Sequence, residues 1–520
     1  MTPSPHDREA LLGALDQRLG EAARVAFEHV ELDVETHGIP GARAAYLLPP
    51  LVAACAAPDR ADLRWLLLTA ATGAFPRLDE VRSFGRLVEV APLHDVESWV
   101  LGRALDEPHR ANAELHLEIV EDGVLVDVDH CARYDTHTGI HRVVRETVPR
   151  WASAHGVTAS AWTDQASALR TLSPRESARV FQHGEPWRAD PDAESGFVPN
   201  LVVPWRSVVV LPDVPKPGFS DQLAALGASS GNTLSIIGYD MIPITSADTR
   251  PARDTLAFAE YLTVVKYAHR VAGISRSATA EFAGFASAVR AQGLRGPRVT
   301  EVLLTEDAPP AAPQGQGRTA RARPSVLCIG SREPHKNQRA VLHAAELLWR
   351  DGLDFDVRLV GGQGWSDEVL RPVVDRLLAA GRPVHDIGRV SEKRLWEELR
   401  GADFTVFVSL HEGYGLPVSE SLACGTPVIT SNFGSQQEIA ERGGCVTVDP
   451  RSDHDIAAAM RRLLTEPAEL DRLRSAAAGR ASRTWDTYAE ELWDALIAPA
   501  DIDEPDESSS TADALEATWL

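Results

Sequence analysis

The spacing of hydrophobic positions changes near residue 118. Before that point apolar residues recur three and four apart, as in amphipathic helices, and strand-like runs are few. After it, short unbroken apolar runs alternate with segments of helical spacing. Because buried parallel strands read as continuous apolar runs, the pattern predicts a mostly helical N-terminal region followed by alternating strands and helices.

The alternating part falls into two series of expected strands. The first comprises 124–128, 157–162, 207–211, 234–239, 271–274 and 299–304. The second comprises 325–330, 356–361, 384–388, 404–409, 427–430 and 445–448. This α/β alternation predicts two Rossmann-like, doubly wound domains. Ligands of such sheets bind at the carboxyl ends of the strands, so the domains are expected to face each other across a cleft.

Six parts are predicted along the chain. They are a helical region 1–118, an acceptor-side Rossmann-like domain 119–307, a linker 308–324, a donor-binding Rossmann-like domain 325–484, a C-terminal helix 485–498 and a disordered acidic tail 499–520. The linker is rich in Pro, Gly and Ala and has no apolar period. The last twenty residues hold seven acidic residues and no Lys or Arg, which favours disorder.

Charge and composition exclude several classes of partner. The net charge of −23 argues against nucleic acid and against broad adhesion to anionic lipid. The five cysteines form no metal-binding or disulfide pattern, and the N-terminus has no signal-peptide pattern. We therefore expect a cytoplasmic protein. Peripheral association with the inner face of a membrane stays open, and the oligomeric state is not determined.

The segment after the strand expected at 404–409 carries the strongest chemical signal. It reads His411-Glu412-Gly413-Tyr414-Gly415-Leu416-Pro417, and Pro417 suits the first position of a helix. The helix would end near Ala423, where Gly425 suits its C-terminal cap. Backbone N–H groups near Gly415, Leu416 and Val418 would then point out of the carboxyl edge of the sheet. A helix N-terminus beside glycines is an anion site, and a diphosphate fits it.

Two glutamates flank this element. Glu412 lies in the loop and Glu420 in the expected helix. Each carboxylate can accept two hydroxyl hydrogen bonds and so clamp a vicinal diol of a sugar. The alternative for Glu420 is an ordinary charge near a helix N-terminus.

A second motif, residues 329–337, follows the first strand of the second domain. Gly330 permits close backbone approach, and Lys336 stands at the start of a helix, where the helix dipole disfavours a cation. A bound anion would explain this placement, whereas the alternative is a solvated lysine. Arg332 could add a forked phosphate contact or lie on the surface.

Four further segments give weaker signals. Residues 361–364 hold three glycines, among them Gly362. They could lie against a base or phosphate, or form a plain tight turn. The absence of a GxGxxG pattern argues against NAD. Ser435 to Glu438 has the pattern of a capping box. In the first domain, Gly139 opens a helix, and Tyr239 and Asp240 follow a strand. Asp240 could orient an acceptor hydroxyl or form an Asx turn.

Residues 325–490 resemble the family 4 retaining glycosyltransferases, which have the GT-B fold. The resemblance lies in IGSREPHKN, LVGGQG, HEGYGLPVSESLACGTPVI and SNFGSQQEIA, and more loosely in TGIHRVVRE and YDMIP of the first domain. It implies that Glu412 contacts the donor sugar, that Glu420 holds the ribose hydroxyls and that Lys336 binds the diphosphate. It also implies that neither a metal nor another cofactor is needed, with the nucleotide-sugar as co-substrate.

The residues expected at the site fall into three groups. The catalytic group is Glu412, Lys336 and Asp240; the donor-binding group is Gly330, Ser331, Arg332, Gly362, Gly413, Tyr414, Gly415, Leu416 and Glu420; the acceptor-side group is Gly139, Arg142 and Tyr239. Many relatives have an arginine directly after the glycine of the second motif. Here Gly330 stands at the spacing of that arginine, six residues before Lys336; Ser331 follows it, and Arg332 comes two positions late.

The expected function is transfer of a hexose from a nucleotide-sugar to a glycan or lipid-linked acceptor with retention of configuration, in surface polysaccharide or glycoconjugate synthesis. Two alternatives remain open. One is a glycan phosphorylase, for which no pyridoxal phosphate lysine can be identified. The other is a non-catalytic subunit that binds a nucleotide-sugar.

Overall fold

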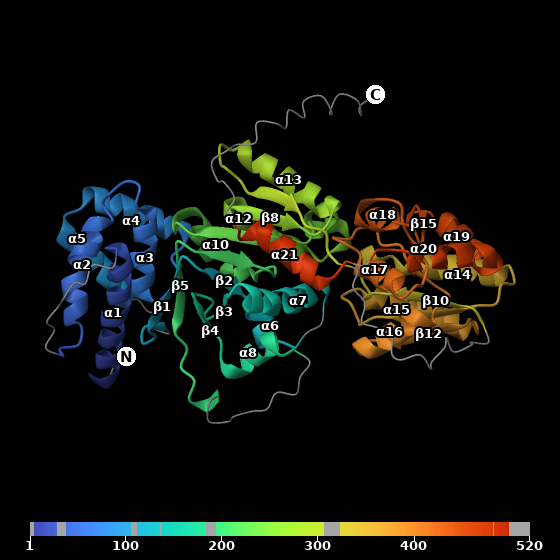
Figure 1. Ribbon diagram of the computed structural model, residues 1–520, viewed down its shortest axis with the longest axis horizontal. Helices are drawn as coiled ribbons and strands as arrows, with labels where there is room; N and C mark the ends of the chain where they lie inside the picture. Colours follow the sequence, from blue (N-terminus) through green and yellow to red (C-terminus); the bar gives the residue numbers. More distant parts are fainter. Residues whose placement is uncertain are drawn as a thin grey trace.

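The computed structural model describes seven stretches of the chain. They are residues 5–28, 38–105, 112–135, 138–183, 194–305, 323–481 and 483–498. Most of the predicted linker, 308–322, and the whole predicted tail, 499–520, lie outside the described residues. The N-terminal helices, the first sheet and the second sheet follow one another along the long axis of the molecule (Figure 1).

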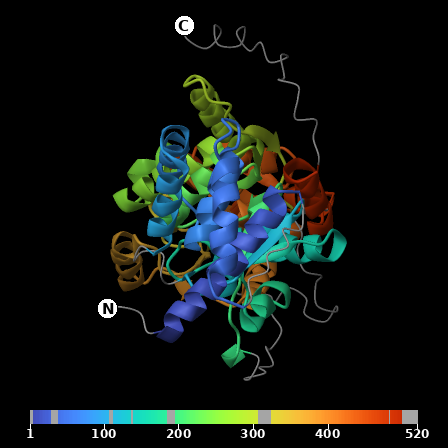
Figure 2. The same ribbon diagram turned by 90° about the vertical axis from the view of Figure 1, so that its left-hand side faces the viewer.

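The N-terminal region is helical, as predicted. Its helices are α1 (Pro5–Ala26), α2 (Ala42–Ala54), α3 (Ala61–Thr72), α4 (Leu78–Val90) and α5 (Leu93–Leu105). Their buried face continues directly into the first sheet, since one hydrophobic cluster includes Leu19 and Leu66 from the helices and Leu169 and Val203 from strands. Figure 2 looks onto these helices from the N-terminal end of the molecule.

The first Rossmann-like domain is built on a nine-stranded sheet. Its strands are β1 (Leu117–Glu121), β2 (Val124–Asp127), β3 (Thr158–Trp162), β4 (Leu169–Thr171), β5 (Leu201–Trp205), β6 (Val208–Leu211), β7 (Thr233–Gly238), β8 (Arg270–Gly273) and β9 (Arg298–Glu301). Its helices are α6 (Asp129–Arg133), α7 (Gly139–Ala154), α8 (Pro174–Phe181), α10 (Ser220–Ser229), α11 (Ile242–Thr245), α12 (Ala252–Tyr267) and α13 (Arg276–Arg290).

The strand order is β1-β5-β4-β3-β2-β6-β7-β8-β9. All neighbours are parallel except β3 with β4 and β4 with β5, which are antiparallel. The six predicted strands are confirmed as β2, β3, β6, β7, β8 and β9. The sequence pattern missed β1, β4 and β5, which extend the sheet toward the N-terminal helices.

The second domain has a six-stranded, fully parallel sheet in the order β12-β11-β10-β13-β14-β15. Its strands are β10 (Ser325–Ile329), β11 (Asp356–Val360), β12 (Val384–Gly388), β13 (Phe404–Phe407), β14 (Val428–Ser431) and β15 (Cys445–Val448), and all six were predicted. Its helices are α14 (Gln338–Arg350), α15 (Asp367–Ala379), α16 (Glu392–Gly401), α17 (Leu416–Ala423), α18 (Gly434–Ala440), α19 (Asp453–Thr465) and α20 (Pro467–Ala478).

The last helix, α21 (Trp485–Leu496), returns to the first domain, where it packs beside α7 (Figure 1). The Trp151 indole N–H donates to the Ala489 carbonyl at 2.8 Å, and the Ser235 hydroxyl donates to the Leu496 carbonyl at 2.7 Å. A single hydrophobic cluster includes Val143 of α7, Val418 of α17 and residues of α21. The two domains are therefore joined by a shared core as well as by the chain. Among the helices of the described stretches, none is both long and apolar enough to cross a bilayer.

Candidate active site

The carboxyl edges of the two sheets meet where the loop after β13 contacts the loop after β7. Gly413 is buried against the backbone of Tyr239, and a Cβ atom added to Gly413 would overlap the Tyr239 carbonyl oxygen. The Ser275 hydroxyl, which also caps α13, donates to the Gly413 carbonyl at 2.7 Å. The glycine therefore permits a backbone approach between the domains that no other residue allows.

Helix α17 begins as the sequence predicts. Gly415 is its N-cap with φ 103°, a left-handed conformation that suits glycine, and Pro417 follows in the first turn. Gly425 has φ 72° just past the helix end. The first-turn N–H groups of α17 thus lie at the domain interface beside Gly139, whose added Cβ would lie 2.9 Å from the Leu416 Cδ1 atom. Diphosphate binding at this helix start stays a prediction, and the Val418 N–H named for it donates to the Gly415 carbonyl at 2.9 Å.

Lys336 and Glu412 come together from two loops of the second domain. The Lys336 ammonium lies 2.7 and 2.9 Å from the two oxygens of Glu412. The side chains are 18% and 10% exposed, so the pair is largely shielded yet reachable. Lys336 ends a short 3₁₀ helix (Pro334–Lys336) before α14, and its ammonium lies over the Phe407 ring. A cation and a carboxylate are thereby held at the end of β13.

Glu420 lies on the second turn of α17 and pairs with Arg142 of the first domain. The Arg142 Nη1 atom is 2.7 Å from a Glu420 oxygen, and 12% of the glutamate side chain is exposed. Burial raises the pKa of Glu420 to about 7, although Arg142 acts in the opposite direction. Glu412 and Glu420 therefore each bind one cation.

Arg332 turns away from this pair. Its guanidinium, 6% exposed, forms ion pairs with Asp367 at the start of α15 and with Asp386 of β12. The expected phosphate contact of Arg332 stays a prediction, and Ser331 donates its hydroxyl to Glu333 at 2.8 Å.

The structure leads us to expect a stability effect for Arg332→Met. Loss of its charge-assisted hydrogen bonds should lower the free energy of unfolding by about 2 kcal/mol and change nucleotide affinity by less than about twofold. Denaturant unfolding and ligand titration measure the two quantities. The control is Arg371→Met, since Arg371 pairs with the same Asp367 but is 44% exposed. A tenfold loss of affinity without loss of stability would instead support the phosphate role.

Backbone packing explains two of the three glycines in residues 361–364. A Cβ at Gly361 would overlap the Gly330 carbonyl, and one at Gly364 would overlap the backbone of Arg332. Gly362 differs, because its added Cβ would come only within 4.0 Å of Arg389. The tight-turn alternative therefore accounts for Gly361 and Gly364, and the donor contact of Gly362 stays a prediction.

On the first-domain side, Tyr239 and Asp240 border Gly413. The Tyr239 hydroxyl donates to the Pro212 carbonyl at 2.6 Å, so this hydroxyl is bonded within the first domain. The Asp240 carboxylate accepts from the Ile242 N–H at 3.0 Å, which is the Asx turn considered as its alternative role. Burial raises the pKa of Asp240 to about 6. The Tyr414 hydroxyl is also bonded to the first domain, since it donates to the Leu304 carbonyl at 2.9 Å.

Several interface residues were missed by the sequence analysis. His411 lies 2.8 Å from a Glu281 oxygen and 2.9 Å from the Ser246 hydroxyl. Burial opposes its charged form, but the hydrogen bond to Glu281 raises its pKa above the usual value. Arg250 pairs with Glu333 at 2.7 Å across the same interface. Partners so distant in sequence leave no local pattern.

The predicted capping box at Ser435 to Glu438 is wrong. Phe433 is the N-cap of α18, and Ser435 donates to the Glu412 carbonyl at 2.9 Å. Glu438 accepts from the N–H groups of Arg276 and Ser277 at 2.9 and 2.7 Å, at the start of α13. Ser435 thus satisfies an acceptor in its own domain, whereas Glu438 satisfies two backbone donors of the first domain and so links the two domains.

One group of side chains could hold a metal ion. In the described part of the chain, ligand atoms of His130, His141 and Asp213 all lie within 4.8 Å of one another. The two imidazole rings stack face to face with centroids 4.0 Å apart, so their nitrogen lone pairs lie in nearly parallel planes. Burial raises the pKa of Asp213 to about 6. The expectation that transfer needs no metal stays a prediction.

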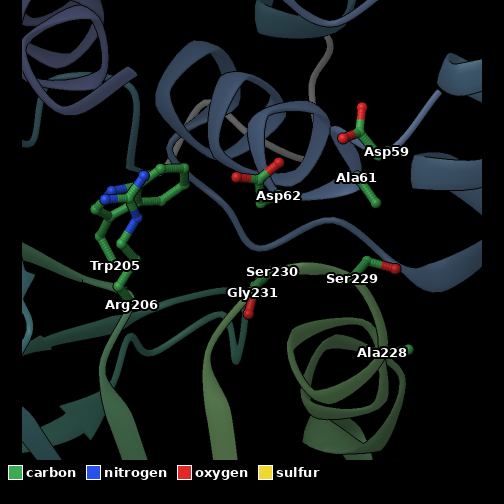
Figure 3. Close-up of a pocket in the computed structure, with 9 residues that line it drawn as sticks. All are labelled: Asp59, Ala61, Asp62, Trp205, Arg206, Ala228, Ser229, Ser230 and Gly231. Atoms are coloured by element: carbon green, nitrogen blue, oxygen red, sulfur yellow. The ribbon is translucent and has the colours of Figure 1, made fainter. Parts of the chain in front are cut away.

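A pocket of about 340 Å³ lies at the opposite edge of the first sheet. It is formed where α3 meets the residues preceding β6 and β7, and it is lined by Asp59, Ala61, Asp62, Trp205, Arg206, Ala228, Ser229, Ser230 and Gly231 (Figure 3). Because these residues lie at the amino ends of β6 and β7, the pocket is separate from the site around Glu412.

Comparison with known proteins supports an assignment of the second domain. Residues 315–480 match the family model of the glycosyl transferases group 1. The chain is 36% identical over 134 residues to an O-antigen chain mannosyltransferase B of Escherichia coli, covering 26% of this chain and 35% of that protein. It is 34% identical over 180 residues to a D-inositol 3-phosphate glycosyltransferase of Thermomonospora curvata, covering 32% and 41%. The matches thus span less than half of either relative.

A solved structure supports the arrangement of the two domains. The structure of Anabaena Alr3699/HepE in complex with UDP and glucose aligns with a TM-score of 0.50 at 12% identity, covering 73% of this chain and all of that one. At this identity the likeness concerns the fold alone. Residues 315–480 thus match the glycosyl transferases group 1, and the two Rossmann-like domains have the GT-B fold.

Proposed function

We propose that the protein transfers a hexose from a nucleotide-sugar to a glycan or lipid-linked acceptor with retention of anomeric configuration. The observation that carries the proposal is the pairing of Lys336 with Glu412 beside the N-terminus of α17, with Glu420 one turn further along. Family membership of residues 315–480 and relatives named as mannosyltransferases agree with it. Surface polysaccharide or glycoconjugate synthesis in the cytoplasm is the setting we propose.

The donor half of the reaction uses charges of the second domain. The N–H groups at the start of α17 and the Lys336 ammonium are proposed to bind the diphosphate, because both favour a negative charge at that place. Glu412 would then exchange its contact with Lys336 for the hydroxyls of the donor sugar. Glu420 would accept hydrogen bonds from the two ribose hydroxyls. These are the roles that the sequence resemblance implied.

Transfer breaks the bond between the anomeric carbon and a diphosphate oxygen and forms one between that carbon and an acceptor hydroxyl oxygen. The acceptor proton passes to the leaving diphosphate on the same face of the sugar, which accounts for retention. Lys336 stabilises the negative charge that develops on the leaving group. No metal enters this proposal. The close contact between Gly413 and Tyr239 would exclude water and favour transfer over hydrolysis.

The acceptor half is proposed to lie on the first domain. Asp240 borders Gly413 and is buried enough that its pKa is about 6. It could therefore orient an acceptor hydroxyl close to the donor sugar. Gly139 lies beside Leu416 and gives room at the start of α7.

Nucleotide binding and turnover test the proposal separately. UDP, GDP, ADP and their hexose conjugates are screened by thermal shift, and one base should stabilise the fold by RT ln(1 + [L]/Kd), about 2.7 kcal/mol at 100 Kd. Glu420→Ala should abolish this stabilisation. Glu397→Ala on the exposed face of α16 should keep it.

Turnover should appear as release of nucleoside diphosphate that depends on an added acceptor. The linkage of the product, read by NMR, should have the anomeric configuration of the donor. Binding without turnover over a broad panel of acceptors would point to the non-catalytic subunit. Inversion of configuration would refute the retaining step.

A further inference from the structure

Arg142 reaches from the first domain into the donor half of the site. It lies in the first turn of α7, and its Nη1 atom is 2.7 Å from the Oε1 atom of Glu420, a residue 278 positions away in sequence. The sequence analysis placed Arg142 on the acceptor side. Its contact with the carboxylate assigned to the ribose brings it to the donor side.

The guanidinium of Arg142 is held by aromatic rings from two other elements. Its central carbon is 5.7 Å from the ring centroid of Trp396 in α16 and 5.6 Å from that of Trp485 at the start of α21. Such contacts attract a cation to an aromatic ring and favour Arg over Lys. Only 22% of the side chain is exposed. The position of Arg142 is thus fixed by both domains and by α21.

We propose that Arg142 is a positioning residue of the donor site, which holds the Glu420 carboxylate from across the domain interface for the ribose hydroxyls. The inference rests on the proposed function and adds to it a residue of the opposite domain. An ionised carboxylate offers about four acceptor positions on two oxygens. The single bond from Arg142 to Oε1 therefore leaves room for two hydroxyls.

Arg142 also supplies the positive charge that opposes protonation of Glu420. Burial raises the pKa of Glu420 to about 7, Arg142 lowers it, and Glu392 of α16 raises it again. Burial raises the thiol pKa of Cys424, one turn further along, to about 11, and the nearby Glu420 adds to this rise. Without Arg142 the remaining influences all favour the neutral carboxyl. A protonated Glu420 has less capacity to accept from a diol, so ribose binding should then require a higher pH.

The two donor carboxylates show the same arrangement. Glu412 is paired with Lys336 of its own domain, and Glu420 with Arg142 of the other domain. Since Arg332 is committed to Asp367 and Asp386, it offers Glu420 no counter-charge. A donor binding to Glu420 would thereby also depend on the position of the first domain. This links donor occupancy to the placement of α7.

The test measures nucleotide affinity against pH with the full chain. UDP, GDP and ADP are each titrated by calorimetry between pH 6 and 9 into the unchanged protein and into Arg142→Gln, Arg142→Lys and Glu420→Gln. Arg150→Gln is the matched control. Arg150 lies eight residues further along α7, about 12 Å along the helix axis, and pairs with Asp486 of α21 at 2.6 Å.

Arg142→Gln should weaken binding about tenfold at pH 7 relative to the unchanged protein and recover most of it at pH 9, where Glu420 ionises. The nucleotide affinity of Arg142→Lys should lie between those of the unchanged protein and Arg142→Gln, because lysine restores the positive charge but not the forked guanidinium. Glu420→Gln should bind weakly at every pH, and Arg150→Gln should follow the unchanged protein. Because each variant is compared with the unchanged protein at the same pH, protonation of the nucleotide itself does not affect the comparison.

Two results would overturn the inference alone. Arg142→Gln could bind nucleotide as tightly as the unchanged protein at every pH, which would show that Arg142 only links the two domains. It could also bind nucleotide more tightly, which would make Arg142 a competitor of the ribose. If the unchanged protein binds none of the three nucleotides, the proposed function itself fails.

Discussion

Lys336→Met is expected to lower the turnover number by about two to three orders of magnitude, the cost of removing one group that stabilises developing charge in a transition state. The ammonium is the cation that the described structure places against Glu412, and its stem runs past Gly330, whose added Cβ would lie 3.7 Å from the lysine Cδ atom. Because methionine keeps the length and apolar character of that stem, the packing should survive. The loss should therefore fall mainly on turnover.

The measurement is release of nucleoside diphosphate at saturating donor and acceptor, with donor affinity determined separately. Lys393→Met is the control, because Lys393 is an exposed lysine on α16 of the same domain. It should keep full activity. Unchanged turnover of Lys336→Met would show that Lys336 serves only to hold Glu412, and the charge stabilisation would then have to come from the N-terminus of α17.

The second domain could be predicted almost completely because its strands are parallel and buried. The central strands β10, β13 and β14 are short, fully buried runs, and Pro417 and Gly425 mark the two ends of α17. These are local signals, since a buried strand and a helix end are determined by neighbouring residues. The same property made Glu412 and Glu420 visible as a pair, eight positions apart on one loop and helix.

The three strands missed in the first domain lack such local signals. β4 spans only Leu169–Thr171, and β5 contains Pro204, which argues against a strand inside a sheet. Its partner β1, in which Val120 pairs in register with Pro204, is Leu-Glu-Ile-Val-Glu, and the two glutamates interrupt any apolar run. Their pairing depends on contacts with the N-terminal helices, which no short window of sequence contains.

The contacts between the two domains were also beyond the reach of sequence patterns. Arg142 and Glu420 are 278 positions apart, and His411 meets Glu281 across the same interface. The error at Ser435 and Glu438 has the same origin. A capping-box pattern describes only local partners, whereas in the structure both side chains bond to residues outside their own helix. The sequence pointed to residues of the first domain at the site, but it did not show which residues of the second domain they contact.

The N-terminal helices carried no interpretable motif, yet their packing shows what holds them. Arg18 of α1 is 2% exposed and donates to the carbonyls of Ala70 and Ala113 at 2.8 and 2.5 Å, with a further bond to Leu115 at 3.0 Å. Ala70 lies in the last turn of α3, where carbonyls lack helical partners and favour a cation. Burial lowers the pKa of Arg18 to about 10, so it stays charged at neutral pH.

Arg18→Met should therefore lower the free energy of unfolding by about 3 kcal/mol, because it leaves several buried carbonyls without donors. Since the helices share one hydrophobic cluster with the first sheet, the loss should reach that sheet. Denaturant unfolding measures the first effect, and faster amide exchange in β1 and β5 measures the second. Arg24→Met, six residues further along α1 at a 38% exposed ion pair, should cost less than about 1 kcal/mol. If exchange rose only within α1 to α5, the helices would be an independent unit, and a role in supporting the acceptor side through the sheet would be excluded.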